Sequence, residues 1–181
     1  MVTNLQISGH GDARFVAVQK AFEQNFTERG DIGAAFCLII GDQVAVDLRG
    51  GWRDAARTRP WEADTVVNLW STTKGIGAIC FAILADRGLM AYDDLVADHW
   101  PAFAANGKQH VTIAMLLSHQ AGLSGFASAA SVADLLAGSA AADRLAAQAP
   151  LWAPGSGSGY HAISIGILAT ELFRRIEGRS L

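Results

Sequence analysis

The feature that most constrains the fold of this chain is an apolar segment, GIGAICFAILA, at residues 75–85. Its apolar residues recur at three- and four-residue spacing, which predicts a helix that begins near Ser71 and ends at Gly88. The segment falls well short of the roughly 18 apolar residues that a membrane span requires. Because a helix that is apolar on several sides needs cover on more than one of them, we expect it to be an inner layer of the fold.

The composition indicates a globular protein with a large core. The chain has 181 residues, of which 51% are hydrophobic and 17% are charged, so a disordered chain is excluded. The net charge is −3 and no cluster of Lys or Arg occurs, which argues against a nucleic-acid partner. The first residues lack a basic start followed by an apolar run, so we expect a soluble, cytoplasmic protein with no membrane partner.

The first third of the chain predicts one helix followed by a pair of strands. Residues 12–28 carry apolar side chains at helical spacing, and Gly30 follows as a terminator. Residues 33–50 form two β-branched, apolar runs around Gly41-Asp42-Gln43, which has the composition of a hairpin turn. The polar, turn-rich residues that follow are expected to be a loop leading to Ser71.

The rest of the chain predicts mostly helices. We expect one over residues 112–122 with Thr112 as its N-cap, a short one opened by a capping box at Ser131, and a final one over residues 162–177. The fold class is therefore α+β, with the strands first. The glycine-rich residues 155–159 are not followed by Gly-Lys-Ser/Thr, so a flexible loop is favoured over a phosphate-binding one.

The helix that begins near Ser71 opens with Ser71-Thr72-Thr73-Lys74, a pattern that allows nucleophilic chemistry. One helical turn brings Lys74 to the same face as Ser71, so its amine can reach the hydroxyl. A serine hydroxyl is a weak nucleophile until a base removes its proton, and a lysine amine in apolar surroundings can be that base. Taken alone, the pattern favours a helix cap at Ser71 and a solvated Lys74 over a catalytic pair, because Ser-x-x-Lys also occurs by chance.

The five histidines do not indicate a metal site. They show neither His-x-x-x-His nor His-Glu-x-x-His spacing, so we expect no metal and no cofactor. The two cysteines, Cys37 and Cys80, lie far apart in apolar runs, which favours buried free thiols.

Several blocks of the sequence, in order, resemble the serine β-lactamase-related proteins of the class C and penicillin-binding type, and especially their carboxylesterase branch. The blocks are GAAFCLIIGDQVAVDLRGGW, TRPWEADTVVNLWSTTKG, LADRGLMAYDDLVADHWP, VTIAMLLSHQAGL, PLWAPGSGSGYHAISIGIL and IEGRSL. The resemblance implies a β-lactamase/transpeptidase-like fold, in which an antiparallel sheet flanked by helices accompanies a helical domain. Residues 1–70 then correspond to the first part of the sheet domain, and residues 71–181 to the nucleophile helix and the helical domain.

The resemblance also implies roles for individual residues. Ser71 is the nucleophile, and Lys74 and Tyr160 share the role of general base and acid. At Ala162 this chain departs from the family, because the lactamases have an asparagine there that helps to hold the amide side chain of the substrate. Four residues around these three are candidates for the substrate pocket: Trp70, His119, His161 and Ala162. His119 is more consistent with holding a loop than with acting as a base. For His161, a position behind the site or on the surface fits as well as one that lines the pocket.

The resemblance therefore predicts a serine hydrolase that cleaves short-chain carboxylic esters through an acyl-enzyme. Two alternatives stay open: a β-lactamase or D-Ala-D-Ala carboxypeptidase, and a catalytically silent binding homologue. The family's sheet is completed by strands that come late in the sequence, so the resemblance also implies that a further C-terminal segment, in the same chain or a separate one, is a partner of these residues.

Overall fold

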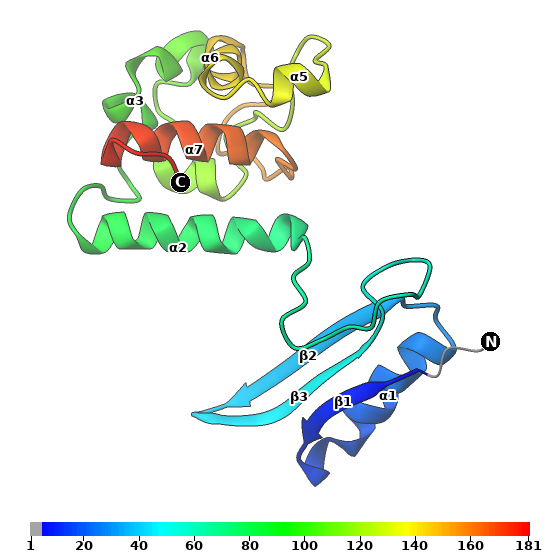
Figure 1. The fold of residues 1–181 in the computed structure, drawn as a ribbon. Coiled ribbons are helices and arrows are strands. Elements are labelled where there is room, and N and C mark those ends of the chain that lie inside the picture. The colour runs from blue at the N-terminus through cyan, green and yellow to red at the C-terminus, as the bar shows by residue number, and fades with distance from the viewer. Residues whose placement is uncertain (1–4) are drawn as a thin grey trace. The chain divides into compact units, whose positions relative to one another are not determined.

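The computed structural model describes residues 5–181, and the chain divides into two compact units, Met1–Asn68 and Leu69–Leu181. The first unit holds the strands and the second is helical (Figure 1). The sequence analysis placed the boundary between residues 70 and 71. No helix within residues 5–181 has the length and apolar character needed to cross a membrane.

The first unit is a three-stranded antiparallel sheet with one main helix. Its strands have the order β1-β3-β2. Phe22 and Phe26 of the helix pack at a ring distance of 5.2 Å, and they meet Val46 and Leu48 of β3 in a small core. The elements are β1 (Ile7–Gly11), η1 (Ala13–Phe15), α1 (Val16–Thr27), β2 (Gly33–Ile40) and β3 (Gln43–Gly51).

The predicted hairpin is present, and Gly41 turns it with a φ of 60°, in the left-handed region that glycine adopts without strain. Strand β1 was not predicted, because only one of the five residues of ISGHG, Ile7, is of the β-branched or aromatic kind typical of strands. It forms by pairing along β3. The prediction that Cys37 is buried was wrong, since its side chain lies on the exposed edge strand β2.

The second unit consists of helices around one hydrophobic core. Its elements are η2 (Trp70–Thr72), α2 (Thr73–Asp86), α3 (Val96–His99), η3 (Pro101–Gly107), α4 (Ile113–Leu117), α5 (Val132–Leu135), α6 (Ser139–Ala147) and α7 (Ser164–Glu177). Helix α7 contacts α2, α3, α4 and α6, and therefore occupies the centre of the unit (Figure 1).

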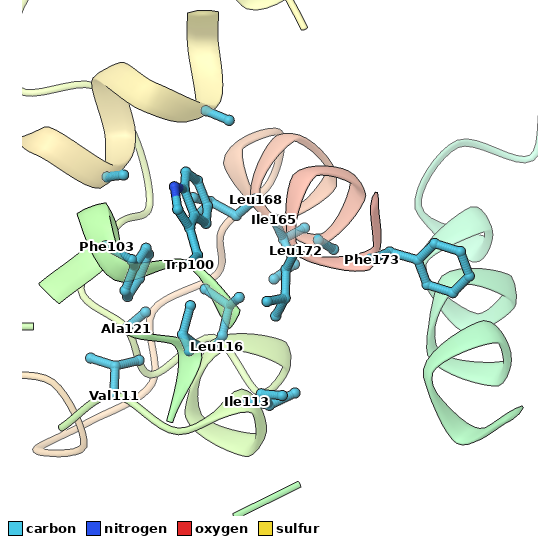
Figure 2. Close-up of a cluster of buried hydrophobic side chains, with 14 of the residues drawn as sticks. Trp100, Phe103, Val111, Ile113, Leu116, Ala121, Ile165, Leu168, Leu172 and Phe173 are labelled. Carbon is cyan, nitrogen blue, oxygen red and sulfur yellow. The ribbon is translucent and has the colours of Figure 1, made fainter. Parts of the chain in front are cut away.

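The core side chains come mostly from α7 and from the segments that surround it. Leu168 and Leu172 of α7 are fully buried against Trp100 and Leu116 (Figure 2). On the opposite side of α7, Phe173 points towards α2 and meets the Phe81 ring edge-on, with the ring centres 5.7 Å apart. Such an edge-on aromatic pair stabilises the contact by about 0.5–1.5 kcal/mol beyond the area that it buries. The side of α2 that carries Phe81 is thus held by α7.

Helix α2 is not covered on all sides in this structure. Phe81 and Leu84 are buried, whereas Ile76, Ile79 and Ile83 are 58%, 57% and 43% exposed. These three residues, called the isoleucine stripe below, lie on one face because they are three and four positions apart. The expectation of a helix buried on several sides therefore holds for one side only.

Candidate active site

Ser71 lies in a tight turn immediately before α2. The turn is η2, and α2 begins two residues after Ser71, at Thr73. Trp70, which precedes the serine, has a φ of 47°. A bulky residue rarely adopts this left-handed conformation, and such strain is concentrated at functional sites. The turn places the exposed Ser71 at the N-terminal end of α2, where unpaired backbone N–H groups favour negative charge.

Lys74 extends from the first turn of α2 back to the serine. Its Nζ donates hydrogen bonds to Ser71 Oγ at 3.1 Å and to the main-chain carbonyl oxygen of Ala162 at 2.8 Å. The same ammonium group lies 5.1 Å from the centre of the Tyr160 ring. The Ala162 carbonyl thus fixes the amine between Ser71 and Tyr160.

Tyr160 reaches the serine from a distant part of the chain. Its phenol O–H donates to Ser71 Oγ at 2.6 Å. Hydrogen bonding with Ser71 and then with Lys74, together with the positive charge of Lys74, lowers the pKa of the Tyr160 phenol. Both partners favour the phenolate, so this group can accept the proton of Ser71 more readily than an ordinary tyrosine.

The loop that carries Tyr160 is held by His119. The His119 carbonyl accepts from the N–H of Gly159 at 3.0 Å, and its Nδ1 accepts from the N–H of His161 at 3.1 Å. The imidazole also lies against the Tyr160 ring, at 5.1 Å between centres. Burial and then the charge of Lys74 lower the His119 pKa, so the ring stays neutral and can keep accepting.

His161 lies behind the site and does not line it. Its side chain is fully buried, Nε2 accepts from the N–H of Leu123 at 2.9 Å, and Nδ1 is 2.5 Å from the carbonyl oxygen of Gly159. Because Nε2 accepts, the proton of the neutral ring must be on Nδ1. Burial lowers the His161 pKa and favours that neutral form. Of the two positions left open for His161 by the sequence, lining the pocket or lying behind the site, the structure has the second.

Two hollows share Ala162, the residue whose carbonyl oxygen accepts from Lys74. The first, of about 470 Å³, is mostly apolar and is lined by Trp70, Lys74, His119 and Ala162 together with residues of α2 and α7. The second, of about 410 Å³, is lined by residues 124–130, Leu135 and residues 162–164. Ala162 and Ile163 line both hollows, and Ala162 is also the residue that accepts from Lys74.

The structure thus brings Ser71, Lys74 and Tyr160 together, and it places Trp70, His119 and Ala162 around them. Sequence reasoning missed the carbonyl of Ala162, because a main-chain acceptor leaves no signal in the residue type. It also missed residues 124–130, which are small apart from Phe126 and include no acidic, basic or imidazole side chain. In the described part of the chain, no group of three His, Cys, Asp or Glu residues is placed to hold a metal.

Comparisons with known proteins identify the family to which the chain belongs. The model of the family described as Beta-lactamase matches residues 18–181. The chain is 40% identical over 176 residues to the esterase/beta-lactamase LipL of Mycobacterium tuberculosis, covering 97% of this chain and 41% of that protein. It is 33% identical over 170 residues to the esterase EstB of Burkholderia gladioli, covering 84% of this chain and 43% of that protein.

Solved structures give the same fold. A family VIII carboxylesterase superposes with a TM-score of 0.88 at 46% identity, over 96% of this chain and 47% of that one. A penicillin-binding protein homologue from Caulobacter crescentus gives 0.92 at 48% identity, over 97% of this chain and 47% of that one. The chain therefore spans somewhat less than half the length of these relatives. The resemblance seen in the sequence is confirmed: this chain has a β-lactamase/transpeptidase-like fold and belongs to the beta-lactamase family.

Proposed function

We propose that these residues carry the nucleophile and the general base of a serine hydrolase that cleaves short-chain carboxylic esters. The observation that supports it most directly is the convergence of Lys74 Nζ, at 3.1 Å, and the Tyr160 phenol, at 2.6 Å, on Ser71 Oγ. Each of these groups, once deprotonated, can accept the proton of Ser71. A serine with two such groups in hydrogen-bond range has the geometry that nucleophilic catalysis requires.

The proposed reaction has two stages. In the first, the Ser71 proton passes to the base formed by Tyr160 and Lys74 as Oγ attacks the ester carbonyl. The tetrahedral intermediate then expels the alkoxide, which takes that proton from Tyr160, and the acyl group remains on Ser71. In the second, the same base takes a proton from a water molecule, and the water oxygen attacks the acyl carbonyl. The bond to Ser71 Oγ then breaks, the base returns the proton to Oγ, and the acid leaves. By the family resemblance, the backbone N–H of Ser71 is one oxyanion donor, and a further segment supplies the other.

The identity of residue 162 favours esters over antibiotics. Ala162 has no side-chain amide, so the group that holds the acylamino chain of a lactam in the family's lactamases is missing at this position. Relatives named esterase or carboxylesterase are 33–46% identical to the chain, although one of them, LipL, is named an esterase/beta-lactamase. A β-lactamase or D-Ala-D-Ala carboxypeptidase is therefore the second candidate, and a silent homologue is the third.

The assignment of the nucleophile can be tested on the full-length protein with an activated alkyl phosphonate. We expect one adduct, located on Ser71 by mass spectrometry, and we expect Ser71→Ala to abolish both the adduct and ester turnover. An adduct on another residue, or unchanged turnover in Ser71→Ala, would refute it. Turnover of nitrophenyl butyrate and of a chromogenic cephalosporin, measured side by side, separates the candidates: faster cephalosporin turnover favours the lactamase, and turnover of neither favours the silent homologue.

We further propose that a C-terminal segment of the same protein is a partner of these residues, in the same chain or in a separate one. In the first unit, β2 is an edge strand that has no strand of residues 5–68 on its outer side, and Ile39 and Ile40 are exposed. In the second unit, the isoleucine stripe of α2 is exposed. Natural proteins cover long apolar edges and faces of this kind, and a further antiparallel segment would do so.

A further inference from the structure

We infer that Arg144 and Gln148 are positioning residues that set the substrate-size selectivity of this site, because they hold the segment that walls one of its two hollows. The inference rests on the proposed function. Neither residue contacts Ser71, Lys74 or Tyr160 through a described hydrogen bond. Both belong to the end of α6, Arg144 within the helix and Gln148 as its C-cap.

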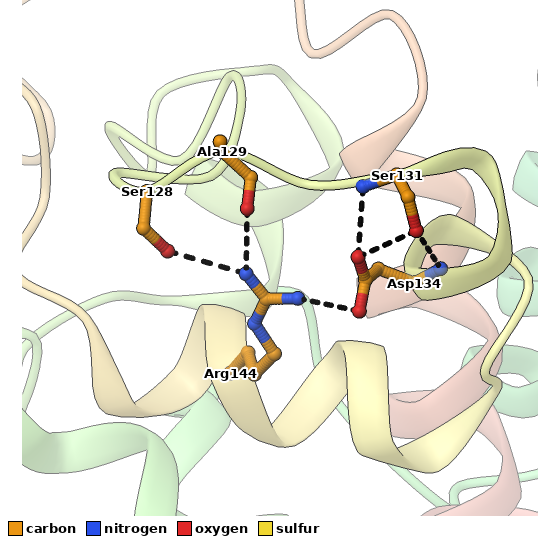
Figure 3. Close-up of polar contacts among 5 residues, drawn as sticks. All are labelled: Ser128, Ala129, Ser131, Asp134 and Arg144. Carbon is orange, nitrogen blue, oxygen red and sulfur yellow. Dashed lines mark hydrogen bonds and ion pairs between the residues drawn. The ribbon is translucent and has the colours of Figure 1, made fainter.

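Arg144 makes several contacts along one stretch of chain (Figure 3). Its Nη2 donates to Ser128 Oγ at 3.2 Å and to the Ala129 carbonyl oxygen at 3.4 Å, and its Nη1 lies 3.1 Å from an Asp134 carboxylate oxygen. The guanidinium carbon also lies 4.8 Å from the centre of the Phe126 ring. The planar guanidinium, with five N–H donors, can make all of these contacts at once, whereas a lysine amine cannot.

The side chain of Gln148 holds the same stretch by bonding to the backbone of residues 125 and 127. Its Nε2 donates to the carbonyl oxygen of Gly125 at 3.0 Å, and its Oε1 accepts from the N–H of Ala127 at 3.0 Å. The two side chains therefore contact every residue from 125 to 129. These residues form neither helix nor strand, so their path depends on such contacts instead of on a backbone ladder.

The stretch held in this way forms much of the wall of the 410 Å³ hollow. Residues 124–130 line one side of it, and residues 162–164 line the other. The second side contains Ala162, whose carbonyl oxygen holds Lys74 Nζ at 2.8 Å. On this proposal, one substituent of an ester bound at Ser71 extends past Ala162 into this hollow, and its permitted size depends on where residues 124–130 lie.

The contacts of Arg144 fix the path of residues 126–129 but contribute little to the free energy of unfolding. The side chains of Arg144 and Asp134 are 37% and 44% exposed, and ion pairs so exposed contribute only about 0–1 kcal/mol. Loss of Arg144 should accordingly move the wall while leaving the unfolding temperature nearly unchanged. That separates a positioning role from a purely structural one.

The test compares Arg144→Lys, Arg144→Ala and Gln148→Ala with wild type in the full-length protein. Two series of esters are assayed, one with lengthening acyl chains on a constant alcohol and one with lengthening alcohols on a constant acyl group. In one series we expect the ratio of kcat/KM between long and short substrates to change by about 10-fold or more, mainly through KM. Arg144→Lys should change it less than Arg144→Ala.

Two measurements keep the result interpretable. The rate at which a small methylphosphonate modifies Ser71 should stay within about twofold of wild type, because the variants leave Ser71, Lys74 and Tyr160 in place. Arg87→Ala is the matched control, since Arg87 is also an exposed, ion-paired arginine, 54% exposed and 3.6 Å from Glu177. Unchanged selectivity in both series, or an equal fall for all substrates and for the phosphonate, would overturn the inference. Failure of the proposed function itself would appear differently, as no Ser71 adduct in the wild-type protein.

Discussion

At the scale of single residues, the proposed mechanism depends on transfer of the hydroxyl proton of Ser71 among Ser71, Tyr160 and Lys74. The phenol of Tyr160 donates to Ser71 Oγ in its neutral form, and as a phenolate it would accept from the same hydroxyl. Lys74 contacts Ser71 and also favours that phenolate through its charge. The two basic groups therefore act as a unit, and removing either should cost most of the rate that the pair provides.

Replacing Tyr160 by Phe should lower kcat/KM for nitrophenyl butyrate by about 10²–10⁴-fold, the range typical of a lost general base. Stability should be nearly unchanged, because the Tyr160 side chain is 57% exposed. Tyr92→Phe is the matched control, since Tyr92 is the other tyrosine of the chain and is 40% exposed. A threefold difference in kcat/KM corresponds to about 0.7 kcal/mol of activation free energy. A kcat/KM of Tyr160→Phe within threefold of the control would contradict the role given to the phenol.

The stability of the protein should fall in acid partly through His161. Burial lowers the pKa of His161 from its ordinary 6.5, so the unfolded chain takes up its proton at a higher pH than the folded one. The contribution is therefore fully present above about pH 6.5 and is lost as the pH falls through the folded-state pKa. His161→Gln, which keeps an acceptor for the Leu123 N–H but does not titrate, should show a weaker loss of stability in acid.

Urea unfolding midpoints at neutral pH and near pH 5 measure this effect. His119, whose pKa burial also lowers, adds a loss in the same direction, so the variant should flatten the dependence without abolishing it. A dependence as steep in His161→Gln as in wild type would assign the acid sensitivity to other groups.

At the scale of elements, helices and strands marked by regularly spaced large apolar residues were predicted correctly. Elements without such residues were missed. Large apolar residues at helical spacing marked α1, α2 and α7 within a few residues of their observed bounds. Helix α6 was not predicted, because its buried positions are mostly alanines, which contribute little to an apolar pattern. The helix after Thr112 ends earlier than expected, at Leu117, since His119 adopts a left-handed φ of 65°.

The same holds for the candidate site. Ser71, Lys74 and Tyr160 could be named from motifs, because their side chains carry the chemistry. The backbone groups that place them, such as the carbonyl of Ala162 and the N–H of Leu123, depend on tertiary contacts that no residue type encodes.

Helix α4 offers a test at this scale. Thr112 caps it, because its Oγ accepts from the N–H of Met115 at 3.1 Å. Thr112→Ala should lower the free energy of unfolding by about 1 kcal/mol, whereas Thr112→Ser, which keeps the acceptor, should cost less. Urea unfolding of the full-length protein measures both. Equal losses in the two variants would show that the methyl group, and not the hydroxyl, stabilises this turn.

At the scale of the whole molecule, the exposed isoleucine stripe of α2 bears on whether residues 1–181 are stable and active without a further segment. An exposed face of this size favours association with other apolar surface. We therefore expect residues 1–181, expressed alone, to show neither a cooperative thermal transition nor ester turnover. A cooperative transition with turnover near that of the full-length protein would contradict the proposed partner segment.

A point substitution tests the same proposal within the full-length protein. Ile79→Asp should lower the free energy of unfolding by several kcal/mol if a partner segment covers the stripe, because it would bury an unpaired charge. Val132→Asp is the control, since Val132 is 71% exposed and lies on α5, away from the stripe. If Ile79→Asp changes stability as little as the control does, the stripe faces solvent.

The bond between Tyr160 and Ser71 joins positions 89 residues apart in the chain, and this separation has a consequence for biosynthesis. The ribosome completes the nucleophile helix long before it adds the tyrosine, at roughly 5–20 residues per second. During that interval of several seconds Ser71 lacks the hydrogen bond from Tyr160. In the proposed mechanism, the nascent chain therefore cannot activate Ser71 through Tyr160 until residue 160 has been added and its loop has folded.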